Sequence, residues 1–324
     1  MFDGESVLVT GGTGSFGQRF VQTVLARHRP QRLIVFSRDE LKQQEMSQRF
    51  SRRVHRCLRY FIGDVRDRPR LERAFDGVDL VVHAAALKQV PVAEYNPFEA
   101  VKTNILGARN VIDAAIDCGV KRVVALSSDK ASSPINLYGA TKLVSDKLFV
   151  DGNAYAGGRS TRFSVVRYGN VVGSRGSVVP LFRQMAKTGV LPVTDERMTR
   201  FWLTLKKGVE FVMDRLCEMR GGEIFVPKIP SMRVVDLARV VAPRATIEFI
   251  GIRPGEKLHE ELISVHDSRR TVDAGDYYVI EPDMEWWAAE AYAGERVPAD
   301  FCYTSDRNSE WLDETSLRTL LENV

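Results

Sequence analysis

The chain has 324 residues, of which 44% are hydrophobic and 27% charged, and its formal net charge is +4. A chain of this length suits one nucleotide-binding domain with a smaller second lobe, and its composition excludes a disordered or collagen-like protein. No Lys/Arg block is dense enough to indicate nucleic-acid binding. The charge permits an anionic small-molecule substrate, although a solvated basic surface is the simpler explanation.

The cysteines and the apolar segments indicate where the protein works. Cys57, Cys118, Cys217 and Cys302 lack metal-type spacing, so we expect thiols in a reducing compartment and no metal site. The N-terminus shows no basic segment followed by an apolar run and a cleavage site. No apolar stretch approaches the roughly 20 residues that a membrane span needs. We therefore expect a cytoplasmic protein without a membrane partner.

Short β-branched runs alternate with amphipathic stretches in the first half of the chain. The runs are nearly continuous in apolar residues, which is typical of strands covered on both faces. Strands are predicted at 6–10, 32–36, 59–62, 80–84, 122–126 and 164–168, and helices at 16–26, 71–75 and 100–118. This alternation predicts an α/β fold with a Rossmann-type, doubly wound parallel sheet.

The rhythm changes after about residue 173, where elements become shorter and Pro and Gly more frequent. We expect residues 1–172 to form the main part of a dinucleotide-binding domain. Residues 173–324 should form mainly a substrate-binding lobe, with some segments returning to the first domain. No repeat or low-complexity linker separates the two parts, so we expect a large interface with the substrate cleft between them.

A glycine-rich loop follows the first predicted strand. Gly11 permits a tight turn, Gly14 lets the backbone approach a pyrophosphate, and Gly17 lets the next helix pack closely. The helix N-terminus then presents N–H groups to the anion. The strand before and the helix after distinguish this loop from a plain glycine turn. It predicts a dinucleotide site formed by Gly11, Thr13, Gly14, Ser15, Phe16 and Gly17.

The second predicted strand ends at the position that separates NAD from NADP. Ser37 and Arg38 offer a hydroxyl and a cation suited to the extra phosphate of NADP, so we expect NADP rather than NAD. Asp39 is either a displaced ribose acid or the cap of a helix.

Later strand ends supply further cofactor contacts. Asp64, followed by Val65, either accepts from the adenine amino group or caps a turn. The small side chains of Ala84, Ala85 and Ala86 let the chain pass close to the cofactor, and we expect His83 to pack rather than to catalyse.

Tyr138 and Lys142 lie four residues apart, on one face of a predicted helix. A free tyrosine titrates near 10, and a nearby cation favours its phenolate, which can take a proton from a hydroxyl as hydride leaves the same carbon. Just upstream, Ser128 can hydrogen-bond that hydroxyl, while Asp129 and Lys130 form a second proton-transfer pair. Elimination of water requires such a pair; the alternative is a surface turn with a local ion pair.

Residues 126–131 and 134–142 resemble the inverting UDP-N-acetylglucosamine 4,6-dehydratases of pseudaminic-acid and related surface-sugar pathways, in the extended short-chain dehydrogenase/reductase superfamily. The likeness covers nearly the whole chain, including 37–40, 86–91, 167–171 and 251–260. It implies an NADP-dependent lyase and a homo-oligomer that turns a UDP-sugar into a 4-keto-6-deoxy product, inverted at carbon 5.

The resemblance also implies roles for individual residues. Tyr138 and Lys142 act in oxidation at carbon 4, and Asp129 and Lys130 in elimination and inversion, with the division between the latter two left open. Ser128 stands where Thr is common. The remaining implied contacts are Lys88 and Asn104 at the cofactor, and Lys88, Asn170, Val178, Arg200, Arg253 and Glu256 at the substrate.

Two alternatives remain. An epimerase or ketoreductase on the same scaffold would not need the Asp129–Lys130 pair. A non-catalytic dinucleotide sensor would have no use for Tyr138 and Lys142 together.

Overall fold

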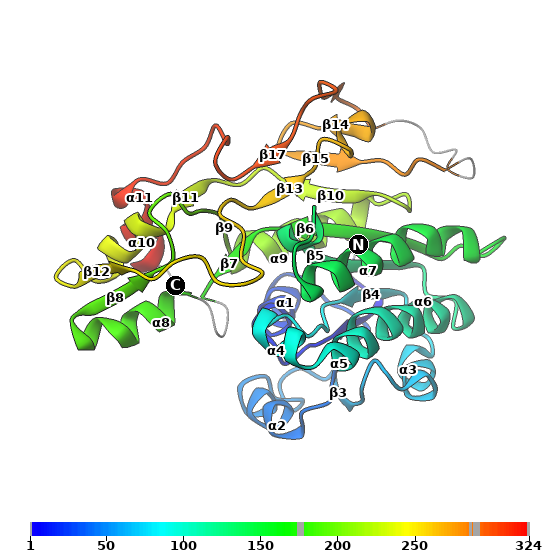
Figure 1. The fold of residues 1–324 in the computed structure, drawn as a ribbon. Coiled ribbons are helices and arrows are strands. Elements are labelled where there is room, and N and C mark those ends of the chain that lie inside the picture. The colour runs from blue at the N-terminus through cyan, green and yellow to red at the C-terminus, as the bar shows by residue number, and fades with distance from the viewer. Residues whose placement is uncertain (1, 174–177, 285–286, 288–291, 323–324) are drawn as a thin grey trace.

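The computed structural model describes residues 2–173, 178–284, 287 and 292–322. Its centre is a ten-stranded sheet (Figure 1). The strands in spatial order are β16 (Glu295–Arg296), β14 (Thr271–Asp273), β15 (Tyr277–Ile280), β10 (Ile224–Pro227), β6 (Arg162–Tyr168), β5 (Arg122–Ser128), β4 (Leu80–His83), β1 (Ser6–Thr10), β2 (Arg32–Ser37) and β3 (Leu58–Ile62). Neighbours from β3 to β10 are parallel, and β15, β14 and β16 are antiparallel.

The parallel sheet is buried because helices cover both of its faces. The helices are α1 (Ser15–Arg27), α2 (Glu40–Arg49), α3 (Arg68–Phe75), α6 (Gly107–Asp117), α7 (Leu137–Tyr155) and α9 (Leu205–Glu218). Both α7 and α9 pack on β5 and β6; α9 lies beside α1, whereas α7 lies beside α6. Val7, Leu8 and Val9 of β1 are fully buried as a result. The predicted Rossmann-type fold and its six first-half strands are confirmed, with strand ends shifted by at most two residues.

The helical stretch predicted at 100–118 is confirmed in position, but it is not one uniform α-helix. The segment is divided into α5 (Pro97–Val101), a π-helical stretch η1 (Lys102–Leu106) and α6, after a short α4 (Val90–Tyr95). Such π-helical turns are rare overall but frequent at functional sites. Here Asn104, inside η1, donates to the Leu87 carbonyl and to Thr141 Oγ1, at 2.9 Å each.

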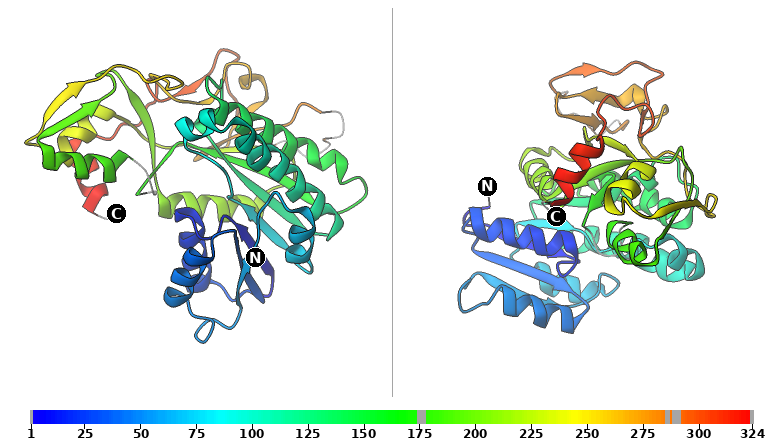
Figure 2. Two further views of the ribbon diagram at one scale, coloured as in Figure 1. Left: turned by 60° about the horizontal axis from the view of Figure 1, so that its bottom comes forward. Right: turned by 90° about the vertical axis from the view of Figure 1, so that its left-hand side faces the viewer.

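The second half of the chain also builds a smaller lobe beside the sheet, at the left of Figure 1 and in both views of Figure 2. It contains α8 (Val178–Met185), η3 (Ala186–Thr188), α10 (Val234–Val241), α11 (Glu314–Glu322), a sheet of β11 (Ser231–Arg233), β9 (Thr199–Thr204) and β7 (Asn170–Val172), and a pair of β8 (Val190–Val193) and β12 (Thr246–Phe249). Leu191, Met232, Leu237 and Leu317 belong to its own apolar core. A further pair, β13 (Glu261–Ile263) with β17 (Tyr303–Thr304), and η4 (Ser268–Arg270) lie near the main sheet.

Among the helices of the described residues, none combines the length and the apolar character that crossing a bilayer requires.

Candidate active site

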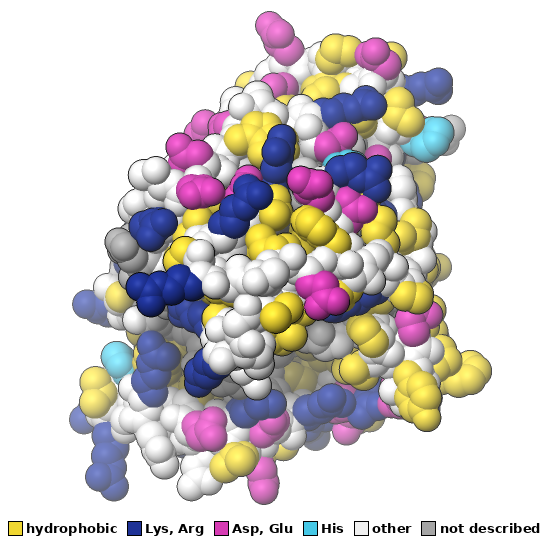
Figure 3. Space-filling model, turned by 60° about the vertical axis from the view of Figure 1, so that its left-hand side comes forward, with side chains coloured by type: hydrophobic (Ala, Val, Ile, Leu, Met, Phe, Trp, Pro, Cys, Tyr) yellow, Lys and Arg dark blue, Asp and Glu magenta, His cyan; other side chains and the backbone are white. Residues whose placement is uncertain are grey.

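A cavity of about 630 Å³ opens at the carboxyl ends of the parallel strands, where open α/β sheets bind ligands. The molecule is hollowed between its two parts, and Lys and Arg side chains lie along the edges of the hollow (Figure 3). Expected site residues that line the cavity are Gly11, Thr13, Gly14, Ser15, Phe16, Ser37, Arg38, Asp64, Val65, Ala84, Ala85, Ala86, Lys88, Ser128, Asp129, Lys130, Tyr138, Lys142, Asn170 and Val178. Those that do not line it are Gly17, Asn104, Arg200, Arg253 and Glu256.

The glycine loop has the shape of a phosphate cradle. Gly11 has a φ of +64°, and a Cβ there would lie 2.9 Å from the Ala85 nitrogen. Gly17 lies outside the cavity because it packs α1 onto the loop, where a Cβ would collide with Gly12. No side chain caps the start of α1, and N–H groups at a helix start have no partner within the helix. These residues fit the pyrophosphate of a dinucleotide.

A buried histidine and a threonine hold this loop against the neighbouring strand end. Thr10 Oγ1 accepts from the nitrogens of Ala84 and Ala85 at 3.1 and 3.3 Å and lies 2.8 Å from His83 Nδ1. The hydroxyl proton is therefore directed at Nδ1, so the imidazole is the acceptor and is neutral. Burial, helped by the charge of Lys142, lowers the pKa of His83 to about 3. His83 packs, as the sequence predicted.

Asn104 clamps the same strand-end loop to α7. Its Oδ1 accepts from the Leu87 nitrogen at 2.9 Å, and its Nδ2 donates to the Leu87 carbonyl and to Thr141. Asn104 therefore lies behind the loop that lines the cavity, rather than in the cavity wall itself.

Two cationic side chains, Arg38 and Lys42, and the carboxylate of Asp39 follow the end of β2. Asp39 caps α2 by accepting from the Lys42 nitrogen at 3.0 Å, and it pairs with Lys42 Nζ at 2.7 Å. The helix-cap interpretation of Asp39 is thus confirmed. Arg38 is 58% exposed and lies 3.8 Å from Asp64, which is bound by Arg66. Lys42 also lines the cavity; sequence reasoning missed it, although its spacing from Asp39 is that of a helix-start ion pair.

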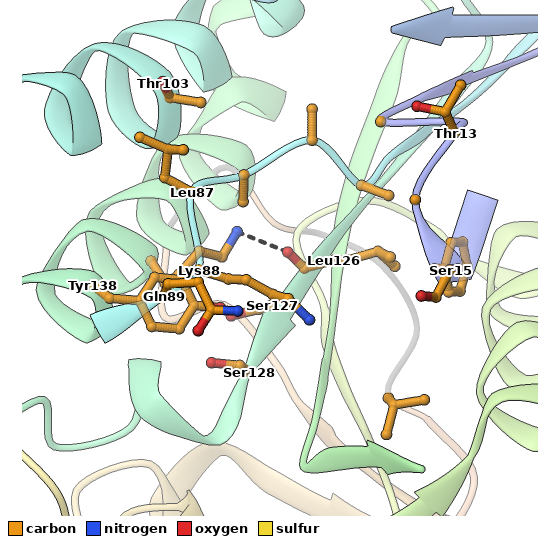
Figure 4. A pocket seen from close by; sticks show the side chains of 18 of the residues that line it. Thr13, Ser15, Leu87, Lys88, Gln89, Thr103, Leu126, Ser127, Ser128 and Tyr138 are labelled. Atoms are coloured by element: carbon orange, nitrogen blue, oxygen red, sulfur yellow. Dashed lines mark hydrogen bonds between the residues drawn. The ribbon is translucent and has the colours of Figure 1, made fainter. Parts of the chain in front are cut away.

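Tyr138 and Lys142 lie on the first turns of α7, where Asn136 caps the helix. Ser128 and Tyr138 lie near each other at the cavity, and Lys142 Nζ donates to the Leu126 carbonyl at 2.7 Å (Figure 4). Burial raises the pKa of Tyr138, and the nearby Ser128 hydroxyl and the charge of Lys130 act against that rise. The cation expected to favour the phenolate was Lys142, so Lys130 is an additional source of positive charge.

The side chains along the cavity divide into two groups. Figure 4 shows Lys88, Ser128 and Tyr138 together on one side, and Thr13 and Ser15 of the glycine loop on the other. A dinucleotide that places its phosphates at the loop can therefore extend its other end toward Tyr138. Burial and the charge of nearby Lys130 lower the pKa of Lys88.

The Asp129–Lys130 pair is not a surface turn. Both residues belong to the short helix η2 (Asp129–Ala131), Asp129 is only 1% exposed, and Lys130 Nζ lies 3.1 Å from Asp129 Oδ1. Burial raises the pKa of Asp129, against the effect of Lys130. Burial alone would lower the pKa of Lys130, but the carboxylates of Asp129 and Glu260 outweigh it and hold this pKa above its ordinary value. Lys130 is therefore an ammonium ion at neutral pH.

The second part of the chain adds a charged wall that sequence reasoning found only in part. Arg200 is buried, and it lies 3.4 Å from Glu256 and 3.5 Å from Glu260. Glu260 was missed: it lies in the stretch that resembles the dehydratases, but nothing in its spacing indicates a contact with Lys130. Arg253 is exposed in the turn that Glu256 closes. Asn170 Oδ1 accepts no hydrogen bond from the described residues.

Residues 174–177 lie outside the described residues, which resume at Val178, the first residue of α8. No group of three or more His, Cys, Asp or Glu side chains with metal-binding geometry occurs in the described ranges.

The sheet order, the glycine loop and the Ser128–Tyr138–Lys142 cluster define a Rossmann-type dehydrogenase/reductase scaffold. A model of the polysaccharide biosynthesis protein family matches residues 7–282. The chain is 53% identical to the UDP-N-acetylglucosamine 4,6-dehydratase (inverting) of Campylobacter jejuni subsp. jejuni serotype O:23/36 (strain 81-176), over 100% of this chain and 99% of the relative. It is 42% identical to a UDP-glucose 4-epimerase of Rickettsia canadensis, over 87% and 84%. The chain belongs to this polysaccharide biosynthesis family.

Two solved structures are also similar. Pen from Bacillus thuringiensis superposes with a TM-score of 0.91 at 39% identity, covering 100% of this chain and 99% of that one. DesIV, a dTDP-glucose 4,6-dehydratase from Streptomyces venezuelae with NAD bound, superposes with a TM-score of 0.69 at 26% identity, covering 78% and 86%.

Proposed function

We propose that this chain is a hydro-lyase that removes water across carbons 4 to 6 of UDP-N-acetylglucosamine and inverts carbon 5. The observation that carries the proposal is the ion pair of buried Asp129 with the partly exposed Lys130, which lines the cavity together with Tyr138. Oxidation and reduction of a sugar hydroxyl need one acid/base group, whereas elimination needs a second. Similarity over the whole chain to an inverting dehydratase supports the same activity.

The cofactor in this proposal is a nicotinamide dinucleotide, and specifically NADP. The glycine cradle and the cavity beyond it fit such a molecule. Asp39 also lines the cavity, but its carboxylate caps α2 and is paired with the Lys42 ammonium, so its negative charge is offset. Arg38 and Lys42 instead border this end of the cavity with positive charge, which favours the extra phosphate of NADP.

Each group of the site has a distinct task in the proposed reaction. A bound nicotinamide supplies reversible hydride acceptance. Tyr138, with the Ser128 hydroxyl nearby, takes the proton of the hydroxyl on carbon 4, and the ammonium group of Lys142 is held by the Leu126 carbonyl. Asp129 has one oxygen that accepts no hydrogen bond from the described residues, and Lys130 is protonated. The pair thus offers a proton acceptor and a proton donor, as loss of the proton on carbon 5 and departure of the hydroxyl on carbon 6 require.

The substrate is proposed to lie between the sheet and the smaller lobe. Asn170 offers an unpaired carbonyl oxygen to an amide donor of the substrate. In the same proposal, Lys88 lies beside the reacting sugar and Val178 contacts the uracil. Arg200, Arg253 and Glu256 surround the expected diphosphate and ribose positions, which requires the turn that carries Arg253 to face the bound substrate. The lobe of residues 173–324 would then be mainly the substrate-binding part.

We also propose that the enzyme works in the cytoplasm as a homo-oligomer. The four cysteines are unpaired thiols, which supports a reducing compartment.

The experiment is to incubate purified protein with UDP-N-acetylglucosamine and NADP and to weigh the product. A product lighter by one water, formed without net consumption of NADP, is expected because the hydrogen taken from carbon 4 is returned at carbon 6. In heavy water, deuterium should appear at carbon 5. A product of unchanged mass would instead identify an epimerase, the second candidate, which the similarity to the Rickettsia canadensis protein favours.

A further inference from the structure

We propose that Glu260 is a positioning residue: its carboxylate holds the Lys130 ammonium against the cavity and ties it to Arg200. Glu260 Oε1 lies 3.3 Å from Lys130 Nζ and 3.5 Å from Arg200 Nε. Asp129 and Lys130 belong to η2, which directly follows β5 of the main sheet. Glu260 and Arg200 come from the second half of the chain. The role rests on the proposed dehydratase function, because it acts through Lys130.

Glu260 is fixed in place independently of Lys130. Its nitrogen donates to Ser305 Oγ at 2.9 Å, and its carbonyl oxygen accepts from the Ser305 nitrogen at 2.8 Å. Ser305 Oγ is itself 2.7 Å from Thr199 Oγ1, beside Arg200 on β9. Two hydrogen bonds to Ser305 therefore fix the backbone at Glu260, and its carboxylate gives the flexible Lys130 side chain a fixed partner.

The exposed fractions of the side chains indicate that the Lys130 ammonium faces the cavity. The side chains of Asp129 and Glu260 are each 2% exposed, whereas that of Lys130 is 25% exposed and lines the cavity. An ammonium group has three donors. Two are used by Asp129 Oδ1 and Glu260 Oε1, so the third is left for the cavity. With Asp129 alone, Lys130 would keep one acceptor and could rotate about its long side chain.

The same carboxylate keeps Lys130 charged in a site with several cations. Lys88, Arg200 and Lys257 face the Lys130–Glu260 pair from the Ala86–Lys88 loop, from β9 and from the turn before β13, while Asp129 and Tyr138 face it from η2 and α7. Without Glu260, Asp129 would be the one remaining carboxylate in contact with Lys130 among the described residues, since Glu256 pairs with Arg200. Burial raises the pKa of Glu260, but Lys130 and Arg200 outweigh it and hold this pKa below its ordinary value. Glu260 is thus a carboxylate over the working pH range.

The test is Glu260→Gln, which keeps the shape and one acceptor oxygen but removes the charge. We expect water loss to slow at least about tenfold, and the basic limb of the kcat profile to move to lower pH by about one unit or more, because Lys130 then loses its proton more easily. The base in the oxidation at carbon 4 is Tyr138 rather than Lys130, so the absorbance of the reduced nicotinamide should accumulate on mixing with substrate. If Glu260 had a merely structural role, Glu260→Gln would slow both the oxidation at carbon 4 and the loss of water, and the basic limb of the kcat profile would stay at the same pH.

Glu261→Gln is the matched control. Glu261 is the next residue, but its carboxylate accepts from Ser132 and Ser133 rather than from Lys130, so the pH limb should not move. If Glu260→Gln does not fold, Glu260→Asp is the test variant. The aspartate keeps the negative charge but holds it farther from Lys130, so water loss should slow while the basic limb of the kcat profile stays nearly unchanged.

Dehydration by Glu260→Gln at the wild-type rate and pH profile would overturn the role of Glu260 alone. A wild-type protein that forms no dehydrated product would overturn the proposed function and this role together.

Discussion

His83 makes the stability of the cofactor loop sensitive to acid. It is 2% exposed, at the end of β4, and its pKa is about 3 instead of the ordinary 6.5. The unfolded chain binds a proton at His83 below about pH 6.5, while the folded chain does not until about pH 3. The stabilisation is therefore complete above pH 6.5 and is lost as the pH falls toward 3.

The size of the effect follows from the two pKa values. Each unit of separation corresponds to about 1.4 kcal/mol. At pH 5, which is about one and a half pH units below the ordinary pKa, the histidine of the unfolded chain is almost fully protonated. Lowering the pH from 7 to 5 should therefore lower the free energy of unfolding by about 2 kcal/mol through His83 alone.

Urea unfolding of the wild-type protein and of His83→Asn at both pH values measures this contribution. The asparagine keeps an acceptor near the Nδ1 position for the Thr10 hydroxyl, but it does not titrate. The variant should be less stable at pH 7, and its loss between pH 7 and pH 5 should be about 2 kcal/mol smaller than that of the wild type. His266→Asn, at an exposed position, should change nothing. Equal acid sensitivity of wild type and His83→Asn would refute a buried neutral imidazole.

The remaining predictions concern the cavity. Arg38→Ala should weaken NADP binding about ten- to a hundred-fold, as expected for one charge-assisted contact, and NAD binding far less. Arg52→Ala, also exposed but outside the cavity, is the control. Equal weakening of both cofactors by Arg38→Ala would mean that Arg38 serves the fold or stacks on adenine. Tyr138→Phe should abolish oxidation at carbon 4. Lys130→Ala should lower water loss by about a hundred- to ten-thousand-fold and stop deuterium uptake at carbon 5 while still binding cofactor and substrate; normal dehydration would reduce Asp129–Lys130 to a structural pair.

The sequence predicted the fold well where one physical signal dominates. Apolar runs of β-branched residues located the strands of the parallel sheet, since a strand covered on both faces has little choice of composition. The break at η1 was not predictable in this way, because it depends on where Asn104 finds Leu87 and Thr141 in the folded chain. A single π-turn adds one residue to a helical turn, and a short pattern of apolar residues does not resolve so small a shift of the helix face.

The candidate site was predictable where its residues are neighbours in sequence. Asp129 and Lys130 are adjacent, and Tyr138 and Lys142 share a helix face, so spacing alone groups them. Glu260 meets Lys130 across 130 positions, and nothing local marks that contact. Burial was likewise not readable: Asp129 and Lys130 have the composition of a surface turn, and only packing makes Asp129 an interior acid.

The strand order of the main sheet bears on how this chain can be divided. β6, at residues 162–168, pairs on one side with β5 and on the other with β10 through Val165–Ile224 and Val166–Phe225. A truncation after residue 172 would remove β10, β15 and β14 and leave β6 as a bare edge strand whose residues are almost all buried in the intact chain. Long apolar edges recruit strands from other molecules. The cofactor half is thus not a separable module: excised from the chain, it carries a template for its own aggregation.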